Sequence, residues 1–188
     1  MINLAVEFID EIVNEHIKVK FDLNENKLVF SNLVNQDGSL SLKENNKIVA
    51  SLVSVQEERM NKSSSMKLGQ GKFNEQGVFK PPMYINLYIL FSVYFEPQLY
   101  NEGLKFLSII ISYFQSNNVF TPETYQELDP AIEKLIFEME NMSLQEQNNL
   151  WASLGCKYLP SVLFKVRMLT ISEDVVIKLG ERIKERST

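Results

Sequence analysis

The chain has 188 residues, a hydrophobic fraction of 45% and a net charge of −5. This length suits one domain with a sizeable core, and the hydrophobic fraction excludes an intrinsically disordered chain. The acidic balance argues against a nucleic-acid-binding protein, because contacts to phosphate groups require a basic surface.

The sequence also predicts where the protein is made and kept. Cys156 is the single cysteine, so no disulfide can form within the chain. Acidic residues interrupt the first 15 residues, where a signal peptide would need an apolar stretch. No apolar run approaches the roughly 20 residues that span a bilayer. We therefore expect a cytosolic protein without direct membrane insertion.

The N-terminal part of the chain changes its hydrophobic period. Apolar residues at helical spacing predict an amphipathic helix over residues 2–15. Ile17, Val19 and Phe21 then alternate with charged residues, which predicts a half-buried strand over residues 17–23.

Three segments follow before the middle of the chain. A short strand is expected over 28–30, and residues 48–56, apolar on both faces, predict an interior strand. Residues 61–79 contain three consecutive serines and three glycines without a core pattern. This composition predicts a long flexible loop, and loops of this kind are often functional.

The most apolar part of the chain begins at Pro81-Pro82, a pair that can start an element but not lie inside one. The run that follows predicts a strand over residues 83–95, although its period alone does not exclude a buried helix. A helix is then predicted over residues 99–115, with only a narrow polar stripe. Such a helix must be covered on most of its circumference, either by the rest of the fold or by another subunit.

The last third of the chain contains four more predicted elements. They are a short helix capped by Thr121, a strand over 134–140, a helix begun by the capping box of Ser143 and Glu146 and ended by Gly155, and a strand over 162–171. Residues 178–188 are charged and are expected to fray. Together the elements predict a single α+β domain over residues 1–175, with a charged tail over 176–188. Its mixed or mainly antiparallel sheet would have four to six strands, with helices 2–15 and 99–115 packed against it.

Two acidic residues offer the best candidate for chemistry. Glu138 and Glu140 share one face of a predicted strand, as an acid/base pair or a metal site would require. The last strand presents Lys165 and Arg167 on its polar face. If the two strands pair, the four side chains form a cross-strand charge ladder, and we favour this structural interpretation.

The other candidate residues carry no chemistry either. The segment Gly69-Gln70-Gly71-Lys72 lacks the Gly-Lys-Ser/Thr ending of a phosphate loop. His16 is the single histidine, so a histidine triad or a histidine-rich metal site would lack its second member. Cys156 has no base nearby in sequence, and Trp151 is interpreted as a core anchor. No catalytic, cofactor-binding or metal-binding residue is therefore assigned.

Three blocks in this order resemble a known family. They are Ala50 to Arg59, the segment Pro81-Pro82-Met83-Tyr84-Ile85-Asn86-Leu87, and Ser143 to Ile171 with its Leu150-Trp151 and Leu159-Pro160-Ser161. As an ordered set they are similar to the N-terminal domain of the cap, or tail-terminator, proteins of contractile injection systems, which are phage-tail-like particles. The resemblance covers the chain from the first helix to about Ile171.

The resemblance implies a structural function. Cap proteins of this family form a homohexameric ring that ends the inner tube and holds the last sheath ring, and the family has no catalytic residues to transfer. The resemblance therefore implies a cytoplasmic protein that assembles with copies of itself and with tube and sheath proteins. The alternatives are a small cytosolic adaptor that binds a partner peptide and, third, a hydrolase that uses Glu138 and Glu140.

Overall fold

The computed structural model describes residues 1–35, 37–39, 41–42, 44–58, 68–70, 76–79, 83–171 and 176–179. The helices are α1 (Ile2–Phe21), the short 3-10 helix η1 (Pro97–Leu99), α2 (Tyr100–Ser116) and α3 (Leu144–Ser153). The main sheet contains β1 (Leu28–Phe30), β2 (Lys47–Glu57), β5 (Met83–Tyr94), β6 (Val119–Phe120), β7 (Leu135–Glu140) and β8 (Ser161–Ile171). Three further short strands are β3 (Leu68–Gln70), β4 (Gln76–Phe79) and β9 (Val176–Leu179).

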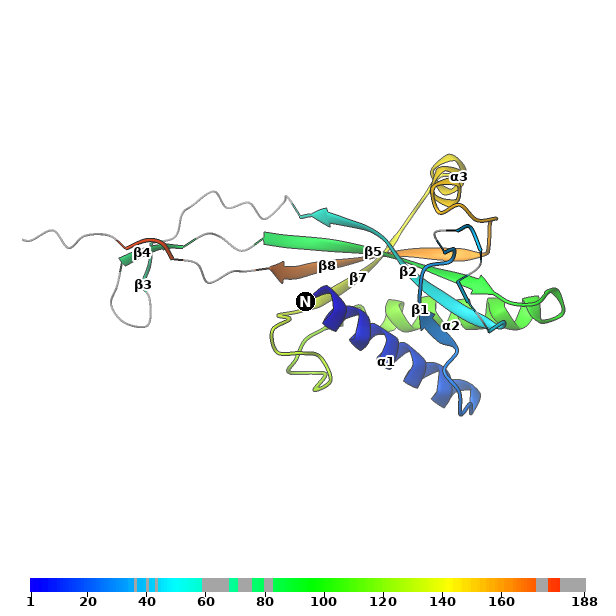
Figure 1. The fold of residues 1–188 in the computed structure, drawn as a ribbon. Helices are drawn as coiled ribbons and strands as arrows, with labels where there is room; N and C mark the ends of the chain where they lie inside the picture. Colours follow the sequence, from blue (N-terminus) through cyan, green and yellow to red (C-terminus); the bar gives the residue numbers. More distant parts are fainter. Residues whose placement is uncertain are drawn as a thin grey trace, which may run out of the picture.

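The main sheet has the strand order β1-β2-β5-β8-β7-β6. β1 runs parallel to β2, and all other neighbours are antiparallel. α1 and α2 lie on one face of this sheet and α3 lies on the other (Figure 1). The prediction of an α+β fold with a mixed, mainly antiparallel sheet is therefore confirmed.

The central strand β5 explains why its sequence shows no alternation. Both of its neighbours are strands, and helices cover the sheet on both sides, so residues of both faces are buried. Leu87, Ile89, Leu90 and Phe91 are each fully inaccessible to solvent. The strand prediction for this apolar run is confirmed, and the alternative of a buried helix is excluded.

The protein has two hydrophobic cores, one on each face of the sheet. The larger core fills the space between the sheet and the helices α1 and α2, and it contains a cluster of aromatic rings. Phe114 of α2 stacks on Phe137 of β7 with a centroid distance of 4.1 Å. The smaller core lies under α3, where Trp151 packs among Leu33, Val49, Leu90 and Leu163.

One predicted strand is a helix. The structure continues α1 through Phe21, so the prediction of a strand over residues 17–23 is wrong. Ile17 and Phe21 continue the four-residue spacing of α1 and face the core, whereas Val19, which completed the alternating pattern, is 86% exposed. Asp22 ends the helix in a left-handed conformation, with the N–H of Leu23 bonded to the carbonyl of Lys18.

The predicted short helix at Thr121 is also wrong. The N–H groups of Thr124 and Tyr125 both donate to the carbonyl of Thr121, which closes a single turn, and no helix follows. Asp129 precedes Pro130, which disfavours helical geometry there, so too few residues remain for a stable helix. The helices predicted from 99 and from Ser143, and the strands over 134–140 and 162–171, are confirmed to within one residue.

The second sheet lies in segments that the sequence assigns to a loop and a tail. Its strand order is β3-β4-β9, with antiparallel pairing. Residues 68–70 and 76–79 are thus not loop, and Lys178 and Leu179 are not frayed. The rest of the predicted loop 61–79 and of the tail 176–188 lies outside the described residues.

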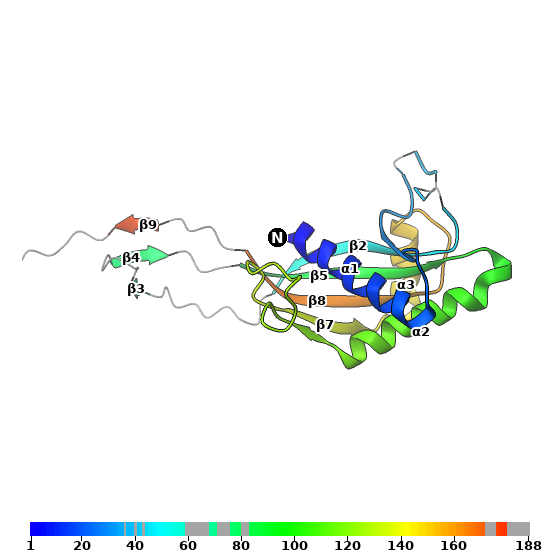
Figure 2. The ribbon, with the colours of Figure 1, turned by 90° about the horizontal axis from the view of Figure 1, so that it is seen from below.

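This second sheet repeats the order of the three strands β2, β5 and β8 to which it is connected. β4 precedes β5 and pairs with β9, which follows β8, so their pairing resumes the pairing of β5 with β8. β3 lies next to β4 as β2 lies next to β5. In Figures 1 and 2 the small sheet lies beyond the end of the main sheet and away from the helices.

Candidate functional site

The charge ladder is present in part. β7 and β8 are antiparallel neighbours, with Glu138 opposite Lys165 and Glu140 opposite Leu163. Glu138 instead pairs with Arg167, which lies diagonally across the two strands: Nη1 of Arg167 is 2.9 Å from Oε1 of Glu138. The prediction of a ladder is confirmed for this pair, whereas Glu140 faces an apolar residue.

Arg167 also contacts a carboxylate that sequence reasoning missed. Nε of Arg167 lies 3.3 Å from Oε2 of Glu58, whose side chain is only 6% exposed. Nδ2 of Asn86 donates to the same oxygen at 3.2 Å. The hydrogen bond to Glu138 and the two nearby carboxylates raise the pKa of Arg167, so its guanidinium stays charged. The polar Asn86 inside an apolar run was the one sequence signal for this network.

His16 and Cys156 occupy structural positions. The imidazole of His16 packs against the ring of Tyr113 with a centroid distance of 4.4 Å, and burial lowers its pKa. Burial raises the pKa of the Cys156 thiol, which keeps it protonated and makes it a poor nucleophile. Neither residue has the environment of an activated catalytic group.

The phosphate-loop candidate is placed only in part, because Gly71 and Lys72 lie outside the described residues. Gly69 and Gln70 lie in β3, which pairs with β4, whereas a phosphate loop must join a strand to a helix. Within the described ranges, no group of three His, Cys, Asp or Glu residues has the geometry of a metal site. The same part of the chain contains no helix that combines the length and the hydrophobicity needed to cross a bilayer.

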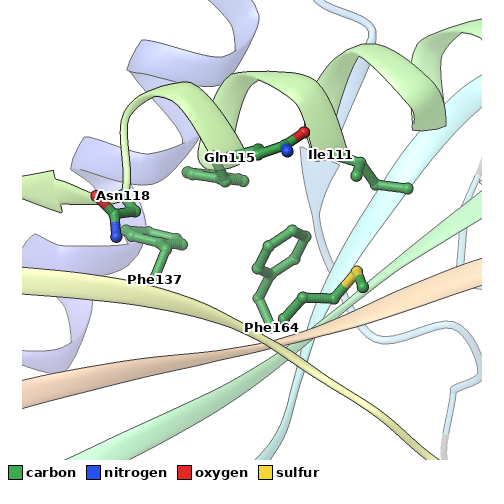
Figure 3. A pocket seen from close by; sticks show the side chains of 7 residues that line it. Ile111, Gln115, Asn118, Phe137 and Phe164 are labelled. Atoms are coloured by element: carbon green, nitrogen blue, oxygen red, sulfur yellow. The ribbon is translucent and has the colours of Figure 1, made fainter.

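The structure instead shows surfaces suited to protein contacts. One is an open groove of about 430 Å³ between the second half of α2 and the strands β7 and β8 (Figure 3). Apolar residues form most of its lining: Ile111, Phe114, Phe137, Met139 and Phe164, with Gln115 and Asn118 as its polar members. Met139 is 52% exposed. Phe114, Phe137 and Phe164 are already buried, so a partner seated here would cover chiefly Met139 and Ile111, without burying a charge.

The outer side of α2 is a second such surface. The buried residues of α2 are Gly103, Phe106, Leu107, Ile110 and Phe114, which form one face of the helix. The apolar residues Leu104, Ile109 and Ile111 remain partly exposed. The fold thus covers only one side of a helix whose sequence predicts burial on most sides, and cover by another subunit remains the open alternative.

The outer edge of β2 is a third surface suited to protein contacts. β1 pairs with β2 only from Ile48 to Ala50, and in the described part of the chain no strand pairs with the outer edge of residues 52–57. Leu52 and Val55 on this stretch are 40% and 46% exposed. An open edge with apolar side chains is a site where an extended segment can add as a further strand.

Comparison with known proteins gives the family. Residues 6–185 match the model of the Pvc16 N-terminal domain. The chain belongs to this family. The resemblance inferred from the sequence blocks is thereby confirmed. The sequence has no significant match among curated proteins.

Two solved structures share the fold of this Pvc16 N-terminal domain. One is the sheath/tube terminator of an extracellular contractile injection system, PVC, in its extended state, with a TM-score of 0.59, 15% identity and 94% of this chain covered. The other is the tube-terminating cap of the anti-feeding prophage, with a TM-score of 0.60, 15% identity and 96% covered. The alignments cover 61% and 60% of those longer chains, so this chain spans about three-fifths of their length.

Proposed function

We propose that this protein is a structural cap of a contractile injection system. Copies of the chain form a homohexameric ring that ends the inner tube and anchors the last sheath ring. The observation that carries this proposal is the shared fold over nearly the whole chain with a sheath/tube terminator and a tube-terminating cap, together with the family match. The cap is made in the cytoplasm and becomes part of a phage-tail-like particle.

The proposal assigns binding surfaces and no catalytic, cofactor or metal site. A ring of identical subunits needs two different complementary patches on each copy. The groove of Figure 3 and the partly exposed Leu104, Ile109 and Ile111 of α2 suit contacts between copies, because they offer apolar area that carries no charge. The open edge of β2 suits a strand from a sheath protein. Residues 61–79 supply a further contact within the assembled particle.

Two measurements test the cap function. Native mass spectrometry of the purified chain should show a sixfold species, whereas an adaptor would remain a monomer or dimer. Electron microscopy of particles assembled with the protein should show tubes of uniform length that keep their sheath. Tubes of uncontrolled length in the presence of the folded protein would contradict the proposal.

Deletion of residues 63–77 tests the proposed contact in that segment. The deletion removes β3 and part of β4 but leaves all six strands of the main sheet. We therefore expect a folded variant that fails to limit tube length. Tubes of normal length with sheath attached would show that residues 63–77 are dispensable, and the edge of β2 would then be the proposed contact.

A further inference from the structure

Charge is distributed unevenly along this chain. Residues 59–82, the basic segment below, contain five basic residues and one acidic residue, which gives a net charge of +4. Because the whole chain carries −5, the remaining residues carry −9. The basic residues of the segment are Arg59, Lys62, Lys67, Lys72 and Lys80.

The main body offers a groove of the opposite charge. A depression of about 570 Å³ lies between α1 and β1, and we call it the α1 groove. Its apolar lining consists of Val6, Leu28, Val29 and Phe30, and its polar lining of Glu7, Asp10, Asn26, Glu44 and Lys47. The groove thus combines apolar walls with carboxylates, as a site for a basic segment with apolar residues would require.

The two sides of the α1 groove differ in their charge balance. On one side, Nζ of Lys47 lies 3.2 Å from Glu44 and 3.6 Å from Glu25, and Nζ of Lys27 lies 2.7 Å from Glu25, so the two lysines balance the two carboxylates. On the other side, Glu7 and Asp10 form no salt bridge with any residue that the structure describes. Glu11 and Glu15 extend Glu7 at four-residue spacing along the exposed side of α1. Like charges at this spacing repel each other, and cations from outside would relieve the repulsion.

The described parts of the basic segment, residues 68–70 and 76–79, lie beyond the end of the main sheet (Figures 1 and 2). They form β3 and β4, and in both views the small sheet that contains these strands lies away from α1. The 24 residues between Glu58 and Met83, running out and back, reach at most about 40 Å. This reach is enough for a neighbouring copy packed against the same body.

We propose that the basic segment of one copy docks in the α1 groove of the next copy. Its lysine side chains pair with Glu7, Asp10 and Glu11, and its apolar residues cover Val6 and Phe30. The contact is heterologous, since a projecting segment meets a groove elsewhere on the surface, and repetition of such a contact gives a ring when the rotation between successive copies closes. This inference rests on the proposed ring-forming cap and specifies one of its subunit interfaces.

A zero-length carbodiimide cross-linker tests the contact directly, because it joins a carboxylate to an amine only when the two touch. Caps are assembled from an equal mixture of unlabelled and ¹⁵N-labelled full-length chains. We expect cross-linked peptides of mixed isotope composition that join Lys62, Lys67 or Lys72 to Glu7, Asp10 or Glu11. Cross-links confined to a single isotope would place the segment in its own groove, and cross-links only to a tube or sheath protein would give it another partner. Either result would overturn the proposal.

Charge reversal provides an independent test. The variant E7K/E11K should raise the concentration needed for half-assembly by about tenfold or more, and so should K67E/K72E, because each places like charges in contact. The variant that combines all four changes should recover assembly close to that of the original chain. The control E127K/E133K changes two exposed carboxylates outside the groove by the same charge and should assemble normally. Circular dichroism confirms that each variant folds.

The design separates this inference from the proposed function. If the original chain forms no ring and limits no tube, the cap function fails, whatever the variants do. If the original chain forms a capping ring, and E7K/E11K assembles equally well without mixed-isotope cross-links, the cap function stands and this interface is wrong. Failure of the fourfold variant to recover, with both pairs of changes weakening assembly, would also refute the pairing.

Discussion

The side-chain amide of Asn14 forms two hydrogen bonds with the backbone of Leu28. Oδ1 accepts from the N–H of Leu28 at 2.9 Å, and Nδ2 donates to its carbonyl at 3.1 Å. Asn14 lies in α1 with 3% of its surface exposed, and Leu28 begins the edge strand β1. The amide forms the hydrogen bonds that a neighbouring strand would form, so it links α1 to the sheet. No further strand can therefore pair with the sheet edge at Leu28.

Replacement of Asn14 tests this link. Asn14→Leu leaves two buried backbone groups without partners, so we expect a loss of about 2–4 kcal/mol in the free energy of unfolding. Urea denaturation at pH 7 measures the loss. The matched control is Asn3→Leu, at an exposed position of the same helix, which should change the stability by less than about 0.5 kcal/mol. Equal stabilities of the two variants would show that the amide contributes little.

Gly103 of α2 permits a close approach of the helix to the end of β5. A Cβ atom at this position would overlap Cγ1 of Val93 and lie 2.9 Å from the ring of Phe95. Gly103→Ala should therefore destabilise the protein by about 1–3 kcal/mol through overpacking, although alanine favours helix formation. The control Ser112→Ala, on the exposed side of α2, should not destabilise the protein. A melting temperature of Gly103→Ala at or above that of the original chain would contradict this account.

Trp151 anchors α3 on the sheet. It is 3% exposed, and its ring lies edge-on to that of Tyr158 at 5.6 Å. Trp151→Ala should lower the free energy of unfolding by about 3–5 kcal/mol, leaving little folded protein. Trp151→Phe should lose much less, because Nε1 has no hydrogen-bond partner within the described residues. A Trp151→Ala variant that melts like the original chain but fails to assemble would show instead a contact residue.

The ion pairs of Arg167 connect β8 with β7 and with Glu58, the residue that follows β2. Arg167→Met would leave the Glu58 carboxylate, 6% exposed, without its guanidinium, so we expect a loss of about 3 kcal/mol. The double variant Glu58→Leu/Arg167→Met removes both charges and should recover much of that loss. Denaturation of the original chain, of Arg167→Met, of Glu58→Leu and of the double variant gives the coupling energy. Additive effects would show that the pair is not coupled.

Asp10 gives the stability a defined pH dependence. Burial raises its pKa from the ordinary value of 3.8, the neighbouring Glu11 adds to this, and the hydrogen bond with Asn14 and the charge of Lys18 oppose it. Because the folded state binds this proton more tightly than the unfolded state, ionisation of Asp10 costs stability above its folded pKa. Asp10→Asn should therefore stabilise the protein at pH 7, and the gain should vanish below pH 3.8. A gain that is equal at both pH values would have another cause.

The elements with unambiguous local signals were predictable from the sequence. The capping box of Ser143 and Glu146 forms as expected, with hydrogen bonds in both directions, and α3 begins there. The Pro-Pro pair marked the start of β5, and the apolar run predicted a strand buried on both faces, although its period alone left the alternative of a buried helix open. The ordered blocks around these elements also gave the family.

The tertiary structure decided those features whose partners are far apart in sequence. The alternation from Ile17 to Leu23 suits a strand locally, but α1 continues because Ile17 and Phe21 pack on the core that the sheet provides. Glu58 and Arg167 are 109 positions apart in the sequence, and only the pairing of β5 with β2 and β8 brings them together. The grooves and the open edge of β2 also arise from packing, since each is formed by elements that local periodicity does not place side by side.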